Sequence, residues 1–160
     1  MSIERYSVGF SRTTTVAPGQ AYAELLAGAA DPVSIKLITV TTASAVGGHV
    51  ALARSHAIGT GAATGIYTGI AHRLGATAAT GPARAQVAWT SSGLTPTGYV
   101  SKLKDELLPI ATGQSAVIWD AQSDGPLLIE PSNSILLVNQ SSGIDGGGLR
   151  INITWEEGRL

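Results

Sequence analysis

The three histidines are the residues in this sequence that could bind a metal ion. They are His49, His56 and His72. A metal site would require them to converge with a carboxylate, and nothing in their spacing demands that. Exposed or hydrogen-bonded histidines are the favoured interpretation, so we expect no metal site.

A glycine-rich stretch from Gly59 to Gly65 superficially matches a dinucleotide-binding loop. In such a loop the glycines let backbone amides approach a pyrophosphate at the start of a helix. No strand, loop and helix unit surrounds this stretch, and no Walker-type lysine follows it. We therefore expect a plain glycine loop and no cofactor.

The usual arrangements for nucleophilic and acid–base catalysis are missing from the sequence. Serine is abundant, but there is no Gly-x-Ser-x-Gly elbow. The adjacent carboxylates Asp105 with Glu106, and Glu156 with Glu157, point to opposite faces of a strand and are predicted to be solvated. The absence of cysteine excludes thiolate nucleophiles and disulfides. We expect no enzymatic activity, with a small β-sandwich hydrolase as a remote alternative.

Three tryptophans fall within predicted strands, at Trp89, Trp119 and Trp155. Aromatic side chains at strand positions more often fill a core or an interface than bind a sugar or a base. We predict core or interface positions for all three. Exposure of all three on one face would instead favour glycan binding.

Short apolar runs separated by Gly, Pro, Ser and Asn predict many short strands. Val33 to Thr42 is rich in β-branched residues, and Leu149 to Glu156 alternates strictly between apolar and polar side chains. Residues 99–110 fit either a helix or a strand. The count of about eight to ten strands favours an all-β, jelly-roll-like β-sandwich.

The chain length fits a single β-sandwich domain over residues 1–160 with one long loop. Residues 55–82 are rich in Gly, Ala and Thr and are predicted to form this loop, because they carry little apolar bulk to order themselves. Its large side chains are predicted to contact a partner. They are Ile66, Tyr67 and Ile70.

A short N-terminal arm, residues 1–5, is the second segment predicted to reach a neighbouring protein. Its predicted contact residues are Ile3, Glu4 and Arg5. The start of the chain lacks the apolar core of a secretory signal, so we expect synthesis in a cytoplasm.

Composition fits an assembled protein and a small soluble domain with a neutral surface equally well, and it indicates no electrostatic partner. Charged residues make up 13% of the chain and the formal net charge is -1. A neutral surface suits burial against copies of the chain or against a larger assembly. It provides no footprint for nucleic acid, and no apolar stretch is long enough to span a membrane. We expect neither as a partner.

Several segments together resemble small virion proteins of tailed bacteriophages, through the order of the strands and a terminal Trp-Glu-Glu. These segments are Tyr6–Phe10, Ala21–Leu25, Ile35–Ile38, Val117–Trp119, Leu136–Gln140 and Ile153–Glu157. The resemblance implies a capsid decoration, or cement, protein without enzymatic activity. It also implies a strand within residues 20–30.

Such a protein is a jelly-roll-like module, often a trimer, that is made in the host cytoplasm and sits on the outer capsid surface. The resemblance implies the major capsid protein as partner, with neighbouring capsid subunits bridged and the capsid stabilised. A tail or head-fibre β module that binds a host glycan is the alternative function.

Overall fold

The computed structural model describes residues 3–12, 21–42, 49–55, 63–72, 80–89, 99–107, 113–140 and 149–158. Eleven strands cover most of these residues, and none of the described residues is helical. The strands are β1 Glu4–Arg12, β2 Ala21–Leu26, β3 Val33–Thr42, β4 His49–Ser55, β5 Ala63–Ala71, β6 Thr80–Trp89, β7 Tyr99–Leu107, β8 Ser115–Asp120, β9 Leu127–Ile129, β10 Ser134–Asn139 and β11 Leu149–Glu157. The all-β prediction is confirmed, with a slightly higher strand count than expected.

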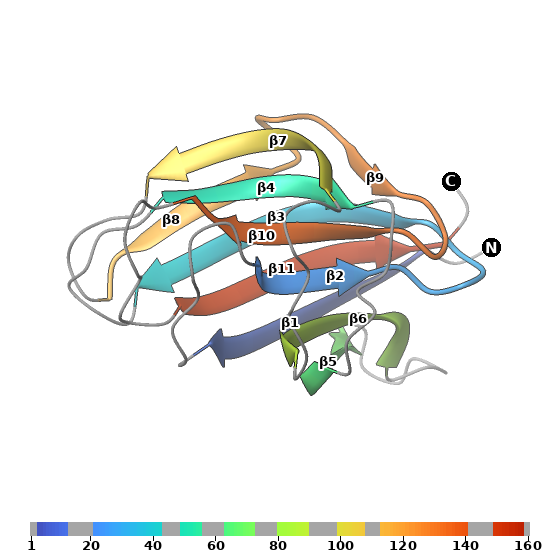
Figure 1. Cartoon of the computed structure of the whole chain (residues 1–160). Coiled ribbons are helices and arrows are strands. Elements are labelled where there is room, and N and C mark those ends of the chain that lie inside the picture. Colours follow the sequence, from blue (N-terminus) through green and yellow to red (C-terminus); the bar gives the residue numbers. More distant parts are fainter. Residues whose placement is uncertain are drawn as a thin grey trace.

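All the strands belong to one antiparallel sheet, which folds over into two facing layers (Figure 1). The first layer has the order β1-β11-β3-β8, with the short β9 also paired to β3, and the second has the order β2-β10-β4-β7. A hairpin of β5 and β6 joins the layers along one side, because β5 pairs with β1 and β6 pairs with β2.

The two layers have the winding of a jelly roll. Without β5, β6 and β9, the first layer holds the first, eighth, third and sixth strands in chain order, and the second layer holds the second, seventh, fourth and fifth. The first strand pairs with the eighth, the second with the seventh, the third with the sixth and the fourth with the fifth. A long hairpin wound into two sheets produces this order, with its two Greek keys. The predicted jelly-roll-like sandwich is therefore confirmed.

The main core lies between the layers and follows from strict alternation along the strands. In β11 the buried side chains are every second residue from Leu149 to Glu157, while their neighbours are exposed or half-buried. Large residues of the second layer, such as Leu52 and Ile135, face them. A second, smaller apolar cluster is separate from this core and comprises Ala21, Ala53, Leu136 and Val138.

Three regions of the structure resolve or correct sequence predictions. Residues 55–82 are not one long loop, because β5 and the start of β6 lie within them. The arm is shorter than predicted, since Glu4 and Arg5 belong to β1 and pair with β11. Residues 99–107 form a strand, which settles the choice left open by periodicity. In each case a partner strand distant in sequence decides the conformation that local composition could not.

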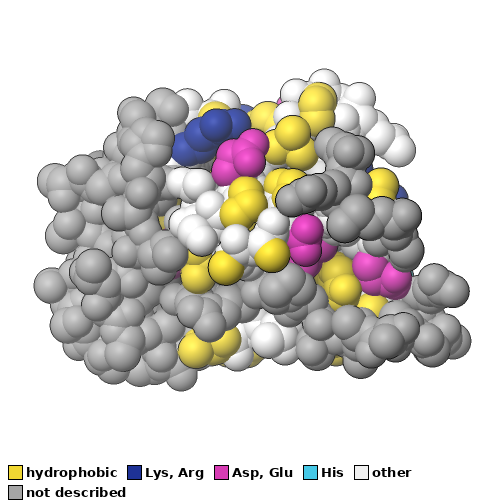
Figure 2. Space-filling view, turned by 90° about the vertical axis from the view of Figure 1, so that its right-hand side faces the viewer, with side chains coloured by type: hydrophobic (Ala, Val, Ile, Leu, Met, Phe, Trp, Pro, Cys, Tyr) yellow, Lys and Arg dark blue, Asp and Glu magenta, His cyan; other side chains and the backbone are white. Residues whose placement is uncertain are grey.

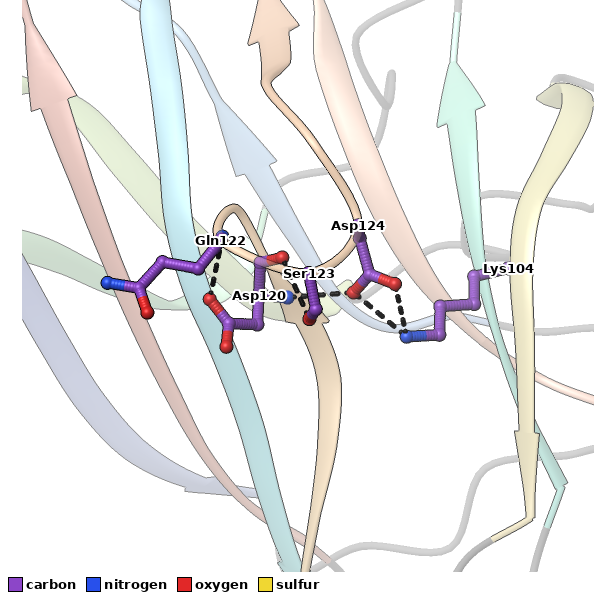
Figure 3. Close-up of polar contacts among 5 residues, drawn as sticks. All are labelled: Lys104, Asp120, Gln122, Ser123 and Asp124. Carbon is purple, nitrogen blue, oxygen red and sulfur yellow. Dashed lines mark hydrogen bonds and ion pairs between the residues drawn. The ribbon is translucent and has the colours of Figure 1, made fainter.

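The two edge strands of the sheet are β7 and β8. An ion pair links β7 to the turn that follows β8 (Figure 3). Lys104 Nζ on β7 lies 2.9 Å from both carboxylate oxygens of Asp124, in the turn after β8. Asp124 Oδ2 also accepts the Asp120 N–H at 2.9 Å, and Asp120 Oδ1 accepts the Gln122 N–H at 2.9 Å. The backbone N–H of Asp120, and then Lys104, lower the pKa of Asp124.

Candidate docking surface

Of the described residues in the predicted N-terminal arm, only Arg5 lies beside the second predicted contact segment, on β5. Ser7 of β1 pairs with Ile70 of β5, and the Arg5 carbonyl accepts a hydrogen bond from the His72 N–H at 2.8 Å. The start of β1 and the predicted contact residues of β5 therefore belong to one surface. We call residues 5–11 together with residues 66–72 the β1–β5 surface.

Two isoleucines on this surface are largely open to solvent. Ile70 is 68% exposed and Ile66 is 56% exposed, the highest values among the large hydrophobic side chains of the described residues. Tyr67 lies between them on the opposite face of β5, where its ring stacks on Phe10 with a centroid distance of 4.8 Å. The predicted contact residues thus divide into two exposed isoleucines and one tyrosine that packs inward.

A groove of about 520 Å³ runs between β1 and β5 on their outer side. Its lining residues are Ser7, Val8, Gly9, Ile66, Tyr67, Thr68, Ile70, Ala71 and His72. Within this lining His72 is the one ionisable side chain apart from the tyrosine, so the groove has little charge of its own. On the β5 side the groove is lined by the apolar side chains of Ile66 and Ile70. On the β1 side Ser7 and Gly9 are small residues.

Ile3 does not line this groove. It is 48% exposed and borders a small cavity of about 80 Å³ together with Leu128 and Glu130. The end view in Figure 2, which faces the side where both chain ends lie in Figure 1, shows small hydrophobic groups separated by acidic side chains. Among the described residues, this face therefore shows no single continuous apolar patch.

Arg5 is held in an ion-pair network on the outer face of the first layer. Its Nη2 lies 2.7 Å from Glu156 Oε1, while Lys36 Nζ on β3 lies 2.8 Å from Glu156 Oε2. Lys36, and then Arg5, lower the pKa of Glu156 below its ordinary value. The predicted contact residue Arg5 therefore already connects three neighbouring strands of its own chain.

The β5–β6 hairpin is packed on a single buried indole. Trp155 of β11 is fully buried and stacks on Tyr6, with ring centroids 6.1 Å apart. Its six-membered ring lies directly against Gly69 of β5, where a side-chain carbon would overlap it. Gly69 is therefore the position where the hairpin can come close enough to close the side of the sandwich.

A buried carboxylate completes this anchor. Glu157 is 6% exposed, and its Oε1 accepts the Trp155 indole N–H at 2.7 Å and the Ala83 backbone N–H of β6 at 3.2 Å. Its Oε2 has no hydrogen-bond partner among the described residues. Burial raises the pKa of Glu157, and Asp31 adds to this effect, although the two hydrogen bonds oppose it. The prediction that this carboxylate is solvated was wrong, because Glu157 continues the inward-facing alternation of β11.

We expect the substitution Glu157→Gln to change how stability depends on pH. Since the folded-state pKa of Glu157 lies above its ordinary value of 4.5, the wild type should lose stability as the pH rises from 4.5 through that folded-state pKa. Glutamine keeps an acceptor oxygen for Trp155 and Ala83 and does not ionise. Urea unfolding at a series of pH values should therefore show a smaller decline for the variant.

The adjacent residue provides a control of opposite sign. Glu156 has a lowered pKa, so its stabilising contribution is present above pH 4.5 and disappears as the pH falls through its folded-state pKa. Glu156→Gln should reduce stability at neutral pH and leave it unchanged in strong acid. Identical pH profiles for the two variants would contradict the assignment of their environments.

The predicted core aromatics occupy different environments. Trp155 is fully buried, whereas Trp119 is half-buried against the core and its indole nitrogen finds no hydrogen-bond partner in the described part of the chain. The side chain of Trp89 lies outside the described residues. Because Trp155 is inaccessible, the three tryptophans do not form one exposed glycan-binding face.

The remaining candidate sites from the sequence are only partly described. His49 lies on β4 and His72 follows β5, while His56 lies outside the described residues. No group of three or more His, Asp or Glu side chains that could hold a metal ion is found over the residues with described positions. The glycine stretch from Gly59 extends into β5, and its first residues also lie outside the described part.

The fold and this surface define a jelly-roll β-sandwich with a joining hairpin that presents exposed isoleucines. Comparisons with protein-family models, with curated proteins and with solved structures found no match to the chain. Within the described residues there is no helix long and apolar enough to cross a membrane.

Proposed function

We propose that this chain is a non-enzymatic structural virion protein that decorates the outer surface of a phage capsid. In this proposal it works as a homotrimer and stabilises the capsid by bridging neighbouring subunits of the major capsid protein. The observation that carries the proposal is the pair of exposed isoleucines, Ile66 and Ile70, on the hairpin that joins the two layers of a jelly roll. Jelly rolls are a frequent fold of viral capsid domains, and also of lectins.

The β1–β5 surface has the properties that an assembly contact needs. It offers apolar side chains on a backbone held by Trp155 and Glu157, so little conformational freedom is lost when a partner binds. Burying an isoleucine stabilises a contact by about 1.5–3 kcal/mol. Weak contacts of this size add up to stable attachment on a capsid, because the linked subunits of a trimer each make the same contact.

The test is the amount of protein carried by assembled particles. We expect the double substitution Ile66→Ser and Ile70→Ser to lower the number of copies per particle at limiting protein concentration by about tenfold or more, since each tenfold in affinity corresponds to about 1.4 kcal/mol. Particles would be purified from cells that produce the phage together with the wild-type or variant chain. Quantitative mass spectrometry would then count the copies of the chain per particle.

A matched control uses two exposed hydrophobic residues away from the hairpin. Leu37 on β3 and Val117 on β8 are 38% and 49% exposed. Serine at both positions should leave the copy number unchanged. Equal losses in the two double variants would contradict the assigned docking surface, and absence of the wild-type protein from purified particles would overturn the proposed function itself.

A further inference from the structure

A second cavity lies at the end of the sandwich where the chain passes from β9 to β10, the end that faces the viewer in Figure 2. β9 belongs to the first layer and β10 to the second, so the turn between them crosses from one layer to the other (Figure 1). The cavity has a volume of about 250 Å³, and its lining includes Arg54, Ile129, Glu130, Asn133 and Ile135. It therefore combines two isoleucines of the core with two side chains of opposite charge.

Arg54 continues the inward-facing row of β4 beyond the core. Val50 and Leu52 of this row are buried in the core, whereas Arg54, two residues further along, is exposed. It pairs with Ile135 of β10, which is also a core residue. An arginine in such a position keeps its aliphatic stem against apolar surface and its charged head at the open end. Its side chain makes no ion pair or hydrogen bond with any other described residue.

Glu130 is positioned by the turn between β9 and β10. Its carbonyl accepts the Asn133 N–H at 3.0 Å, and the Ser132 N–H donates to the Gly28 carbonyl at 3.0 Å. These bonds close the turn and tie it to the segment that follows β2. The exposed Glu130 carboxylate forms no ion pair with Arg54 or with any other described side chain, although both residues line the same cavity. The cavity thus holds one positive and one negative group that do not neutralise each other.

We propose that this cavity binds a small zwitterion with an apolar side chain, an α-amino acid such as leucine. The carboxylate of the ligand pairs with the Arg54 guanidinium, whose planar N–H groups suit two parallel hydrogen bonds. The ammonium group of the ligand pairs with the Glu130 carboxylate, and the aliphatic side chain packs on Ile129 and Ile135. This binding site does not depend on the proposed attachment to a capsid.

The two charges and the size of the cavity define this class of ligand. An amine without a carboxylate would place a second positive charge beside Arg54, and a dicarboxylate would place a second negative charge beside Glu130. A charged ligand side chain would lose water against the isoleucines without gaining an ionic partner. The volume of about 250 Å³ lies below the range of about 300–1,000 Å³ that is typical of drug-sized ligands, so a molecule of the size of one amino acid fits.

NMR titration of the purified chain with L-leucine tests the proposal. We expect saturable shifts of the backbone amide signals of Arg54, Ile129 and Asn133, and no shift at Val8, which lies on β1 outside the cavity lining. L-Leucinamide lacks the carboxylate and N-acetyl-L-leucine lacks the ammonium group. Each should bind about tenfold more weakly than leucine or worse, because each loses one charged hydrogen-bonding partner.

Two variants assign the two charges of the ligand to the two side chains. Arg54→Gln should weaken leucine binding about tenfold and remove the preference for leucine over leucinamide, while Glu130→Gln should remove the preference for leucine over N-acetyl-leucine. Arg150→Gln is the matched control, because Arg150 is exposed on the outer face of β11, and it should leave the affinity for leucine unchanged. All three positions are exposed, so urea unfolding should show wild-type stability for each variant within about 0.5 kcal/mol.

The outcomes that contradict the site are equally specific. Equal affinity of the wild type for leucine and its two blocked derivatives would show that neither charge is recognised and would overturn the proposal. Leucine binding that is unchanged in both Arg54→Gln and Glu130→Gln would overturn it as well, as would the absence of saturable shifts. Because the titrations use the purified chain alone, these results bear on the cavity and not on the β1–β5 surface.

Discussion

Replacing Trp155 with alanine should lower the free energy of unfolding by about 3–5 kcal/mol. The indole is fully buried, stacks on Tyr6 and donates its N–H to Glu157 at 2.7 Å. Its removal leaves a cavity beneath the β5–β6 hairpin and takes a donor from a buried carboxylate, and both effects are destabilising. Urea unfolding of the purified chain at neutral pH measures the loss.

Two comparison variants separate packing from hydrogen bonding. Trp155→Phe keeps much of the aromatic volume but not the N–H, so it should lose less than the alanine variant. Trp119→Ala removes a half-buried indole that makes no described hydrogen bond and should also cost less. A loss at position 155 no larger than the loss at position 119 would refute the anchoring role of Trp155.

A single methyl group at position 69 should be the second most damaging change, with a loss of about 2–3 kcal/mol. The Cβ of Gly69→Ala would overlap atoms Cζ2 and Cη2 of Trp155 and lie 3.0 Å from the Cβ of Tyr6. Neither ring can move freely, because both are buried in the core. The hairpin must therefore shift away from the sandwich, and thermal or urea unfolding will detect the lost stability.

The neighbouring position and a double variant test this mechanism. Thr68→Ala, at an exposed site on the same strand, should change stability by less than about 0.5 kcal/mol. Because phenylalanine lacks the outer ring of the indole, Gly69→Ala should cost less in a Trp155→Phe background. Strictly additive effects of the two substitutions would show that position 69 does not act through Trp155.

The strands of the sandwich could be predicted wherever one side of the strand is apolar and the other polar. Val33–Thr42 and the alternation that begins at Leu149 correspond closely to β3 and β11. Residues 63–71 could not be identified in this way, since their large side chains, Ile66, Tyr67 and Ile70, do not fall on alternate positions. Their strand pairs with β1 and β6, and Gly69 lies against Trp155 from the far end of the chain; no local window contains the contacts with β1 and Trp155.

The proposed docking surface could be predicted in part, from the size of its side chains alone. Ile66 and Ile70 stand out in a tract of Ala, Gly and Thr, and both lie exposed in the structure. Their position beside β1 could not be foreseen, because it follows from strand pairing over long sequence separations. Glu157 was the clearest signal missed: it lies two residues after Trp155, on the apolar side of the most regular alternation in the chain.

The nested pairing of the jelly roll also sets the order of events when the chain folds. The first strand pairs with the last, and the ion pair between Arg5 and Glu156 joins residues 151 positions apart. Contacts so distant in sequence require closing a loop that is nearly the whole chain, and all-β proteins of this kind fold in about milliseconds to seconds. Among the described strands β11 is synthesised last, and it supplies the partner of β1 and the anchor for the hairpin. The β1–β5 surface therefore forms only after β11 has been translated, so a chain that lacks β11 cannot form it.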